Sequence, residues 1–283
     1  MPELPKDIGD QVAAALIEDV GSGDVTALLV PETQQVRGRV VTREDAVMCG
    51  RAWVDETFRR LDPTIRIEWR AQDGERIRPE QVLFEISGNA RPVLTGERTA
   101  LNFLQLLSAT ATQARRFVEA VRDTGCTILD TRKTVPGLRT AQKYAVLCGG
   151  AQNLRMALYD MVLIKENHIA AAGSISGAIA AAKKAAPGLK IEVEVESLSG
   201  LEQALAAAPD IVMLDNFSLA GMREAVEFTR ARSKTVKLEA SGNVSLEGVR
   251  ETAATGVDYI SIGAITKHIR AVDLSMRLEF SHQ

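Results

Sequence analysis

From about residue 110 onward, short apolar segments alternate with helical segments, and this alternation constrains the fold most strongly. Six apolar segments have the composition of buried strands, and they end at Asp130, Lys165, Glu196, Asp215, Ala240 and Gly263. Apolar strands that alternate with helices form parallel βα units. A doubly wound sheet could hold them, but no GxGxxG motif follows the first strand.

Most of these expected strands end in a charged or reactive side chain, and this favours an α/β barrel. The residues concerned are Asp130, Lys165, Glu194 or Glu196, Asp215 and Glu239. In an α/β barrel the carboxyl ends of the strands form the active site. The alternative is that strand ends are polar only because loops are polar.

Residues 1–108 have a different pattern. A helical segment is followed by strand-like segments, and turn signals at Asp73-Gly74 and Gly88-Asn89 separate them. We therefore expect a small α+β domain over 1–108 and the barrel over 109–267. The tail "DLSMRLEF" alternates apolar and polar residues, which predicts a half-buried strand. Residues 268–283 are expected to return to the N-terminal sheet.

Composition and charge exclude several classes of protein. The formal net charge is -3, and no basic run is interleaved with aromatic residues, which argues against nucleic acid as a partner. No 18-residue apolar run is present, so a membrane span is not expected. The N-terminus lacks the apolar region of a signal peptide. These features predict a cytoplasmic protein.

The cysteines and histidines are few and widely spaced. Cys49, Cys126 and Cys148 form no CxxC pair, and the three histidines form no HxxxH pair. This spacing argues against a structural zinc site, and an odd cysteine count is typical of a reducing compartment.

Basic residues follow two of the expected strands. Arg132 and Lys133 come directly after the first, and Lys165 ends the second, with Arg155 upstream of it. Arginine binds carboxylate or phosphate through two hydrogen bonds, so these side chains suit an anionic substrate. Lys165 could instead form a Schiff base if its pKa were depressed. A solvated basic loop is the alternative for Arg132 and Lys133.

The segment "KIEVEVES" places Glu192, Glu194 and Glu196 on one face of a strand, with valines on the other. In a barrel, the valines should face the helices and the glutamates the lumen. Buried carboxylates need cations, and Mg²⁺ prefers carboxylate ligands. Asp215, on the next strand, could complete a magnesium or sugar-hydroxyl site. The alternative is an edge strand with a solvated acidic face.

Two loops of small residues follow the last two strands, Ser241–Asn243 and Ile262–Thr266. Glycine-bearing loops at this place in a barrel commonly bind a phosphate through backbone N–H groups. The expected substrate therefore carries a phosphate, further anionic groups, and hydroxyls or a metal.

In combination, these motifs resemble those of the quinolinate phosphoribosyltransferase family, of bacterial type. The matching segments are "GERTALNFLQ", "LDTRKTVPGLR", "KYAVLCGG", "LIKENHI", "EVEVE", "MLDNF", "SGNV" and "SIGAITKH". The resemblance implies an α/β sandwich-like N-terminal domain and an incomplete barrel of six or seven parallel strands, as in type II phosphoribosyltransferases. It also implies a homodimer, or a higher oligomer, with shared active sites.

The resemblance assigns roles residue by residue. Arg132, Arg155 and Lys165 would bind the two pyridine carboxylates, and Arg98 would reach in from the partner subunit. Thr131 would also contact substrate. The ribose, pyrophosphate and Mg²⁺ would be bound by Lys133, Glu194 and Asp215, with Glu194 and Asp215 as metal ligands. The 5-phosphate would be bound by Ser241, Gly242, Asn243, Ile262, Gly263 and Ala264.

The implied reaction converts quinolinate and phosphoribosyl pyrophosphate to nicotinate mononucleotide, pyrophosphate and CO₂. One segment departs from the family pattern: Leu154 stands in place of a usual histidine, and Ala151 and Ala157 in place of glycines. A transferase for another pyridine or heterocyclic base, a Schiff-base aldolase, and a binding protein without turnover are the alternatives.

Overall fold

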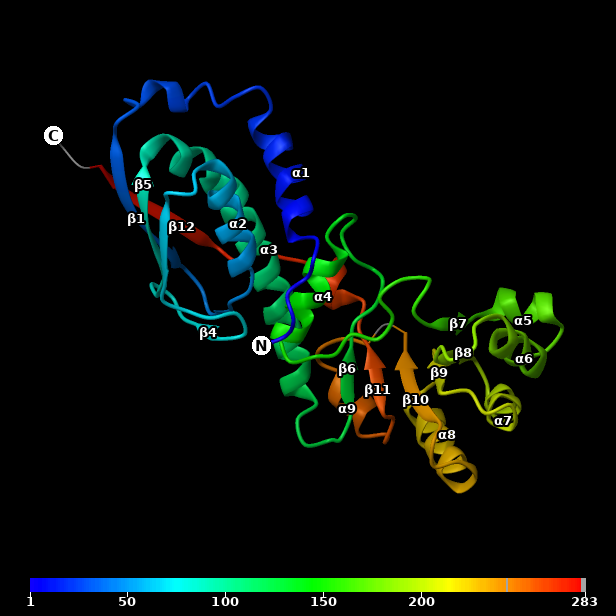
Figure 1. Ribbon diagram of the computed structural model, residues 1–283. Coiled ribbons are helices and arrows are strands. Elements are labelled where there is room, and N and C mark those ends of the chain that lie inside the picture. Colours follow the sequence, from blue (N-terminus) through cyan, green and yellow to red (C-terminus); the bar gives the residue numbers. More distant parts are fainter. Residues whose placement is uncertain (243, 281–283) are drawn as a thin grey trace. The chain divides into compact units, whose positions relative to one another are not determined.

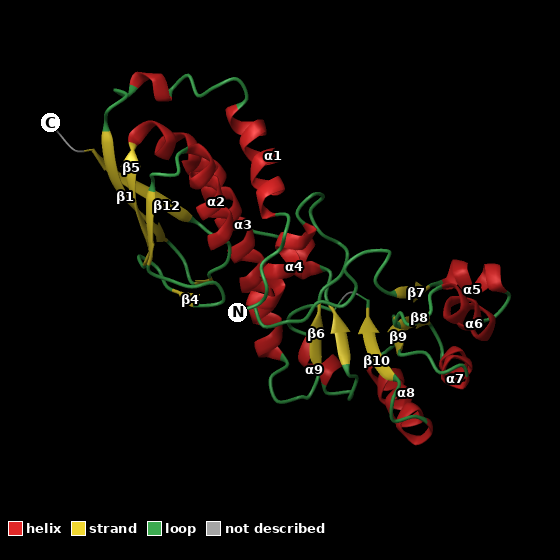
Figure 2. Cartoon of the chain, viewed as in Figure 1, coloured by secondary structure: helices red, strands yellow, loops and turns green. Residues whose placement is uncertain are grey.

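A computed structural model describes residues 1–242 and 244–280, and the chain divides into two compact units (Figures 1 and 2). Unit 1 comprises Met1–Arg115, Thr134–Gly150 and Ala264–Gln283, and unit 2 comprises Arg116–Lys133 and Ala151–Gly263. The boundary expected between residues 108 and 109 falls inside one long helix, α3 (Ala90–Ala120). Each unit is therefore assembled from separate stretches of chain.

Unit 1 contains a four-stranded antiparallel sheet in the order β12-β1-β5-β3. The strands are β1 (Gln35–Thr42), β3 (Arg66–Trp69), β5 (Val82–Asn89) and β12 (Leu274–Phe280). The tail strand β12 pairs with β1 from Val36↔Phe280 to Thr42↔Leu274. A separate small ladder joins β2 (Ala46–Val47) to β4 (Arg76–Ile77).

Helices α2 (Arg51–Leu61) and α3 cover this sheet (Figure 2). Phe58 of α2 and Leu101 and Leu104 of α3 pack with Phe84 and Ile86 of β5 in one buried cluster. Each such side chain contributes about 1.5–3 kcal/mol when removed from water. The remaining helices of unit 1 are α1 (Ile8–Val20), η1 (Ala27–Leu29), α4 (Arg139–Cys148) and α10 (Ala264–Lys267).

Helix α4 corrects one expectation, because the sequence alternation assigned it to the barrel. Its buried Tyr144 packs with Trp53 of α2 and with Phe103 and Leu107 of α3. The apolar face of α4 therefore completes the core of unit 1, and α4 groups with that unit.

Unit 2 contains six parallel strands in the order β6-β11-β10-β9-β8-β7. They are β6 (Thr127–Leu129), β7 (Val162–Ile164), β8 (Ile191–Val195), β9 (Ile211–Asp215), β10 (Lys237–Ser241) and β11 (Tyr259–Ser261). Strands β6 and β7 form the two edges, as in the expected incomplete barrel, and Gln152 bridges to Leu129 of β6. The predicted fold class is confirmed.

The helices of unit 2 follow the strands: α5 (Glu166–Ala172), α6 (Ile175–Ala185), α7 (Leu198–Ala206), α8 (Leu219–Arg232) and α9 (Val249–Ala253). Three of them share one capping device. Ser174, Ser197 and Ser218 each accept a hydrogen bond from a glycine N–H three residues later. A serine cap satisfies a free helix N–H and so defines where the helix begins.

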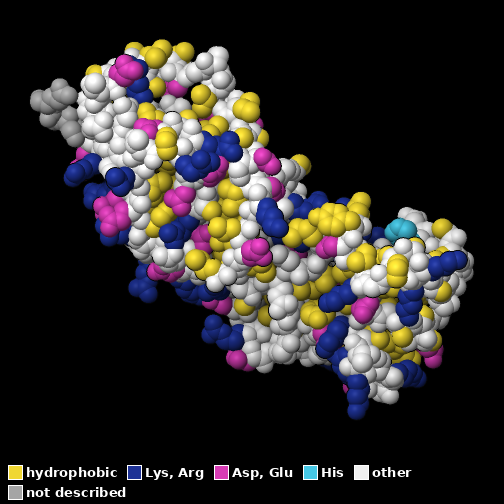
Figure 3. All heavy atoms as spheres, viewed as in Figure 1, with side chains coloured by type: hydrophobic (Ala, Val, Ile, Leu, Met, Phe, Trp, Pro, Cys, Tyr) yellow, Lys and Arg dark blue, Asp and Glu magenta, His cyan; other side chains and the backbone are white. Residues whose placement is uncertain are grey.

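The outer surface is mixed in charge. Basic and acidic side chains are interspersed over the face shown in Figure 3, in keeping with the small net charge of -3. Among the described residues, no helix combines the length and the apolar character needed to cross a bilayer.

Candidate active site at the strand ends of unit 2

The strand register places four polar residues of unit 2 on one face of its sheet. Glu194 lies opposite Met213 of β9, and Met213 lies opposite Glu239 of β10. Asp215 lies opposite Ser241. Residues opposite each other in a ladder share a face, so these four polar side chains lie together.

The valines of β8 face the other way. Val193 and Val195 are buried, and a Cβ placed on Gly200 of α7 would lie 3.3 Å from the Cβ of Val195. This contact puts the valine face against the helices and the glutamate face away from them. The predicted register of the strand is confirmed.

The three glutamates differ in depth. Glu192 is 1% exposed, the side chain of Glu194 is 14% exposed, and Glu196 is exposed. The row therefore runs from the interior of the sheet to its rim, and Glu194 is accessible to a ligand while in contact with the protein.

Lys165 pairs with Glu194. The Lys165 Nζ donates to Glu194 Oε2 at 2.5 Å, across from β7 to β8. Lys165 is the N-cap residue of α5, and its backbone N–H donates to His168 Nδ1 at 3.0 Å. Because the lysine side chain is 51% exposed, this pair adds little stability. Its effect is to hold the ammonium group in place beside the Glu194 carboxylate.

Asp215 ends β9 among charged groups. Burial raises the pKa of Asp215 and the charge of Glu194 raises it further, whereas Lys165 and Lys133 act in the opposite direction. Asn216 Nδ2 donates to Asp215 Oδ2 at 2.8 Å. Two carboxylates and two ammonium groups thus influence one another at this edge of the sheet.

The loops after β9 and β10 touch through Gly242. Gly242 has φ +108°, and a Cβ there would lie 2.6 Å from Asn216 Oδ1. Asn216 itself is in the left-handed region at φ 56°. Glycine is therefore required at 242 for this close approach of two loops. Asn216 was not among the residues expected at the site. Its position directly after Asp215, at the end of a strand, is the feature of the sequence that could have pointed to it.

The loops after β6 and β11 also meet. A Cβ on Gly263 would lie 2.9 Å from Lys133 Cδ and 3.6 Å from Thr131 Oγ1. The N–H of Lys133 donates to Thr131 Oγ1 at 3.1 Å, and Ile262 N–H donates to the carbonyl of Leu129 at 2.9 Å. Thr131, Lys133, Ile262 and Gly263 are therefore brought together.

Arg132 and Arg155 form a positive pair. Burial lowers the pKa of Arg155, and the charge of Arg132 lowers it further. Arg155 Nε donates to the carbonyl of Ala157 at 2.9 Å, and Asp160 accepts from the N–H of Ala157 at 2.9 Å. Two guanidinium groups that repel each other are suited to an anion with more than one negative charge.

Leu154 and Ala151, where we expect departures from the family pattern, lie close to Arg155 along the chain. Leu154 precedes Arg155 and is half-buried, and its backbone N–H donates to Asp130 Oδ1 at 3.3 Å. Ala151 is buried. The backbone at 154 is anchored, but the leucine side chain adds no hydrogen-bonding group to the site.

Glu239 is a site residue that the sequence identified only as a strand end. Glu192 and Glu239 are each 1% exposed, and each influences the pKa of the other. Burial and the charge of Glu239 raise the pKa of Glu192 to about 9, and burial raises the pKa of Glu239. The pair therefore holds a proton at neutral pH and forms the interior end of the polar face.

Two expected residues belong to unit 1. Arg98 is an exposed residue of α3 in unit 1, and Ala264 begins α10 in unit 1. Asn243 lies outside the described residues.

Glu194 and Asp215 fit a magnesium ion. Their carboxylates lie on the same face of adjacent strands and are close enough for the charge of one to shift the pKa of the other. Carboxylate oxygens are the ligands that Mg²⁺ prefers, with water completing the shell.

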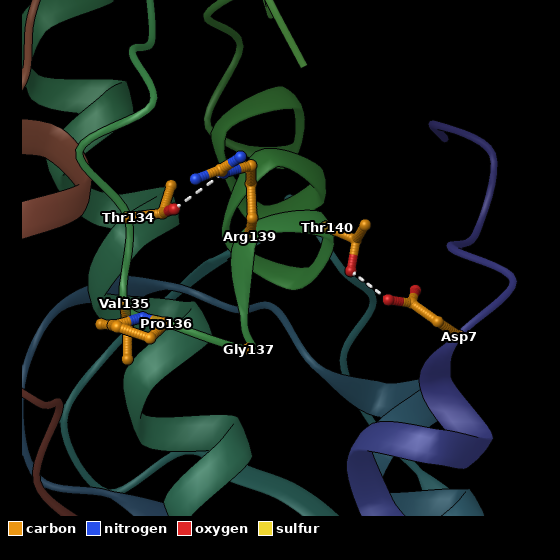
Figure 4. Close-up of a pocket in the computed structure, with 7 residues that line it drawn as sticks. All are labelled: Asp7, Thr134, Val135, Pro136, Gly137, Arg139 and Thr140. Carbon is orange, nitrogen blue, oxygen red and sulfur yellow. Dashed lines mark hydrogen bonds between the residues drawn. The ribbon is translucent and has the colours of Figure 1, made fainter. Parts of the chain in front are cut away.

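A pocket in unit 1 surrounds the segment that continues from Lys133 (Figure 4). Arg139 Nε donates to Thr134 Oγ1 at 3.1 Å, and Thr140 Oγ1 donates to Asp7 Oδ2 at 2.8 Å. These bonds fix the Pro136-Gly137 turn to the beginning of α1. The pocket is lined by Asp7, Thr134, Val135, Pro136, Gly137, Arg139 and Thr140.

Known protein families and curated relatives match almost the whole chain. Residues 24–108 match the model of the quinolinate phosphoribosyl transferase N-terminal domain, and residues 110–277 match that of the C-terminal domain. A nicotinate-nucleotide pyrophosphorylase [carboxylating] of Mycobacterium leprae is 43% identical over 276 residues, covering 95% of this chain and 96% of the relative. A probable enzyme of the same name from Bacillus subtilis is 39% identical, covering 94% and 92%.

Solved structures give the same result. The nicotinate-nucleotide pyrophosphorylase of Francisella tularensis aligns with a TM-score of 0.92 and 45% identity, covering 98% of both chains. NadC of Streptococcus pyogenes aligns with a TM-score of 0.94 and 37% identity over 100% of both chains. Both domains of the family are matched in order, and the relatives are matched nearly end to end. The chain therefore belongs to the quinolinate phosphoribosyl transferase family.

Proposed function

We propose that this chain catalyses Mg²⁺-dependent transfer of the phosphoribosyl group from phosphoribosyl pyrophosphate to quinolinate, with decarboxylation. The products are nicotinate mononucleotide, pyrophosphate and CO₂, in de novo NAD biosynthesis. The observation that carries the proposal is the polar sheet face in unit 2, where Lys165, Glu194, Asp215 and Lys133 influence one another. Family membership supports the same reaction.

The basic residues suit the pyridine dicarboxylate. Arg132 and Arg155 repel each other, so a dianion between them removes an unfavourable interaction. Lys165, held by Glu194, supplies a further positive charge. Thr131 lies beside Lys133, and Arg98 completes the site from the partner subunit of a homodimer.

The acidic residues suit the sugar donor. Glu194 and Asp215 bind the ribose hydroxyls and hold Mg²⁺, which when bound neutralises charge on the departing pyrophosphate. Lys133 binds the pyrophosphate as a point charge. The loops Ser241–Asn243 and Ile262–Ala264 bind the 5-phosphate; the small residues Gly242 and Gly263 allow the backbone to approach it.

The residues contribute mainly by position and charge. Positive charge develops on the ribose ring as pyrophosphate leaves, and Glu194 and Asp215 stabilise it. The pyridine nitrogen bonds to the sugar as the bond to pyrophosphate breaks. When the 2-carboxylate then departs as CO₂, the adjacent positive nitrogen stabilises the electron pair left on C2, which takes up a proton from solvent. Two anionic reactants that would repel in water are held side by side.

The test incubates the purified chain with quinolinate, phosphoribosyl pyrophosphate and Mg²⁺ and measures nicotinate mononucleotide. We expect Lys165→Ala to lose at least about 100-fold in kcat/KM. Lys184→Ala, in the last turn of α6, is the matched control and should keep full activity. Absence of product at high enzyme concentration would refute the proposed substrate, and full activity of Lys165→Ala would refute its role.

The proposed reaction also indicates the partners and the location of the protein. The partners are small molecules and a second copy of the chain, with no nucleic acid and no membrane, and the location is the cytoplasm.

A further inference from the structure

We propose that Cys49, Asp73 and Cys148 form a binding site in unit 1 for a thiophilic divalent cation of the zinc class. One ligand atom from each of these residues lies within 4.8 Å of the other two, and all three residues are buried. The site is separate from the transferase residues and does not depend on the proposed reaction.

The spacing of the three atoms is close to what such an ion requires. Zinc binds thiolate sulfur at about 2.3 Å and carboxylate oxygen at about 2.0–2.2 Å, in tetrahedral geometry. Two sulfurs on one zinc are therefore about 3.8 Å apart. A sulfur and an oxygen on the same ion are about 3.6 Å apart, so the separations need to shorten by at most about 1.2 Å to bring all three atoms onto one ion.

The ligands come from three segments that hydrogen bonds hold in place. Asp73 Oδ1 accepts from the N–H of Gly50 at 3.0 Å, and Asp73 Oδ2 accepts from the Tyr144 hydroxyl at 2.9 Å. The Cys49 N–H donates to Ser108 Oγ at 3.0 Å. Partners of this kind orient the ligands of a metal site.

The end of α4 is fixed in the same way. Arg115 Nε donates to the carbonyl of Gly149 at 2.8 Å, and an η nitrogen of Arg115 donates to the carbonyl of Cys148 at 3.3 Å. Cys148 is thus held at the helix end with its backbone anchored, and a metal ion would join α4 to the segments that carry Cys49 and Asp73.

Charge balance favours the ion in this buried place. Binding forms two metal–sulfur bonds and releases two thiol protons to solvent. The two positive charges of the ion therefore replace the two positive charges of the protons. The net charge of the cluster is unchanged, and the Asp73 carboxylate keeps Arg51 as a nearby counter-charge.

The sequence spacing concealed this cluster. The expectation of no structural zinc site rested on the absence of CxxC and HxxxH pairs, but here the ligands are separated by 24 and 75 positions along the chain. Packing of α4 against α2 and α3 brings them together.

The experiment titrates the reduced, chelator-treated full chain with Co²⁺ under anaerobic conditions. We expect one ion per chain, a thiolate-to-cobalt charge-transfer band, and displacement of cobalt by Zn²⁺. Cys148→Ser and Asp73→Asn should weaken binding by more than about 100-fold, since loss of orienting partners alone costs 10–100-fold. Cys126→Ser, at a half-buried cysteine of unit 2, is the matched control and should bind as the wild type does.

Several outcomes would overturn the proposal. They are no charge-transfer band in the wild type, an unchanged band in Cys148→Ser, and loss of the band in Cys126→Ser. A mass two hydrogens below that of the reduced chain, in protein purified without reductant, would assign Cys49 and Cys148 to a disulfide instead. Far-ultraviolet circular dichroism checks that each variant is folded, and the wild-type titration decides the question even if a variant is not.

Discussion

Leu154 places a branched apolar side chain directly before Arg155, in a segment whose backbone is anchored to Asp130. A histidine at 154 would add a hydrogen-bond donor next to the guanidinium pair. A hydrogen bond to a charged group is worth about 1.5–3 kcal/mol. Leu154→His should therefore raise kcat/KM for quinolinate about tenfold.

The control is Leu158→His, because Leu158 is four positions away and exposed. Steady-state rates at varied quinolinate concentration test both variants. Equal kcat/KM for the wild type and Leu154→His would show that position 154 has no part in binding the base.

Glu56 gives a pH-dependent prediction for unit 1. Hydrogen bonds from Arg59 lower its pKa most, those from Arg60 add to this, and burial opposes them; the result is a pKa of about 2 instead of 4.5. A lowered carboxyl pKa stabilises the fold above pH 4.5, and this stability is lost as the pH falls toward 2.

Glu56→Gln should therefore reduce the free energy of unfolding by about 1 kcal/mol at pH 7, and the difference from the wild type should disappear near pH 2. Urea unfolding across pH 2 to 7 measures it. Glu202→Gln, at an exposed position in α7, should leave the curve unchanged. A difference that grows as the pH falls would contradict the assignment.

At the scale of elements, the loops after β9 and β10 depend on Gly242. The positive φ and the 2.6 Å approach of an added Cβ to Asn216 Oδ1 both oppose any side chain there. Gly242→Ala should cost about 1–3 kcal/mol of stability and displace the loop proposed to bind the 5-phosphate. We expect KM for phosphoribosyl pyrophosphate to rise.

Gly248→Ala is the comparison, because Gly248 has a negative φ and its added Cβ would come no nearer than 3.7 Å to Ser245 Oγ. Thermal unfolding and KM measurements distinguish the two. Equal stability and equal KM in both variants would rule out a special requirement at 242.

The sequence was sufficient to predict the strands of unit 2. The apolar runs are short and bounded by loops, so the parallel strands and the face of Glu194 followed from local pattern. The placement of α4 could not be predicted from the local pattern. Its helical pattern is the same whether the helix covers a barrel or completes another core. The Glu192–Glu239 pair also needed the structure, since two strands with β9 between them must be in register.

At the scale of the whole molecule, the proposed function needs a dimer in which Arg98 serves the site of the partner subunit. Arg98→Ala and Lys165→Ala should each be nearly inactive. When equal amounts are mixed and subunits exchange, half of the dimers are mixed, and each mixed dimer has one intact site. Activity should recover to about one quarter of the wild-type value.

Co-purification of differently tagged chains verifies that exchange has occurred. Mixed dimers that stay inactive would place Arg98 outside the partner's site. A chain that is monomeric in solution would refute an active site shared between subunits.

The central claim is that this site attaches phosphoribose to a pyridine dicarboxylate and removes one carboxylate. Its most direct test uses quinolinate labelled with ¹³C at the 2-carboxylate, with phosphoribosyl pyrophosphate and Mg²⁺. The account predicts labelled CO₂, pyrophosphate and unlabelled nicotinate mononucleotide in equal amounts, and no comparable turnover of nicotinate. Equal use of nicotinate, or a nucleotide that retains the label, would contradict it.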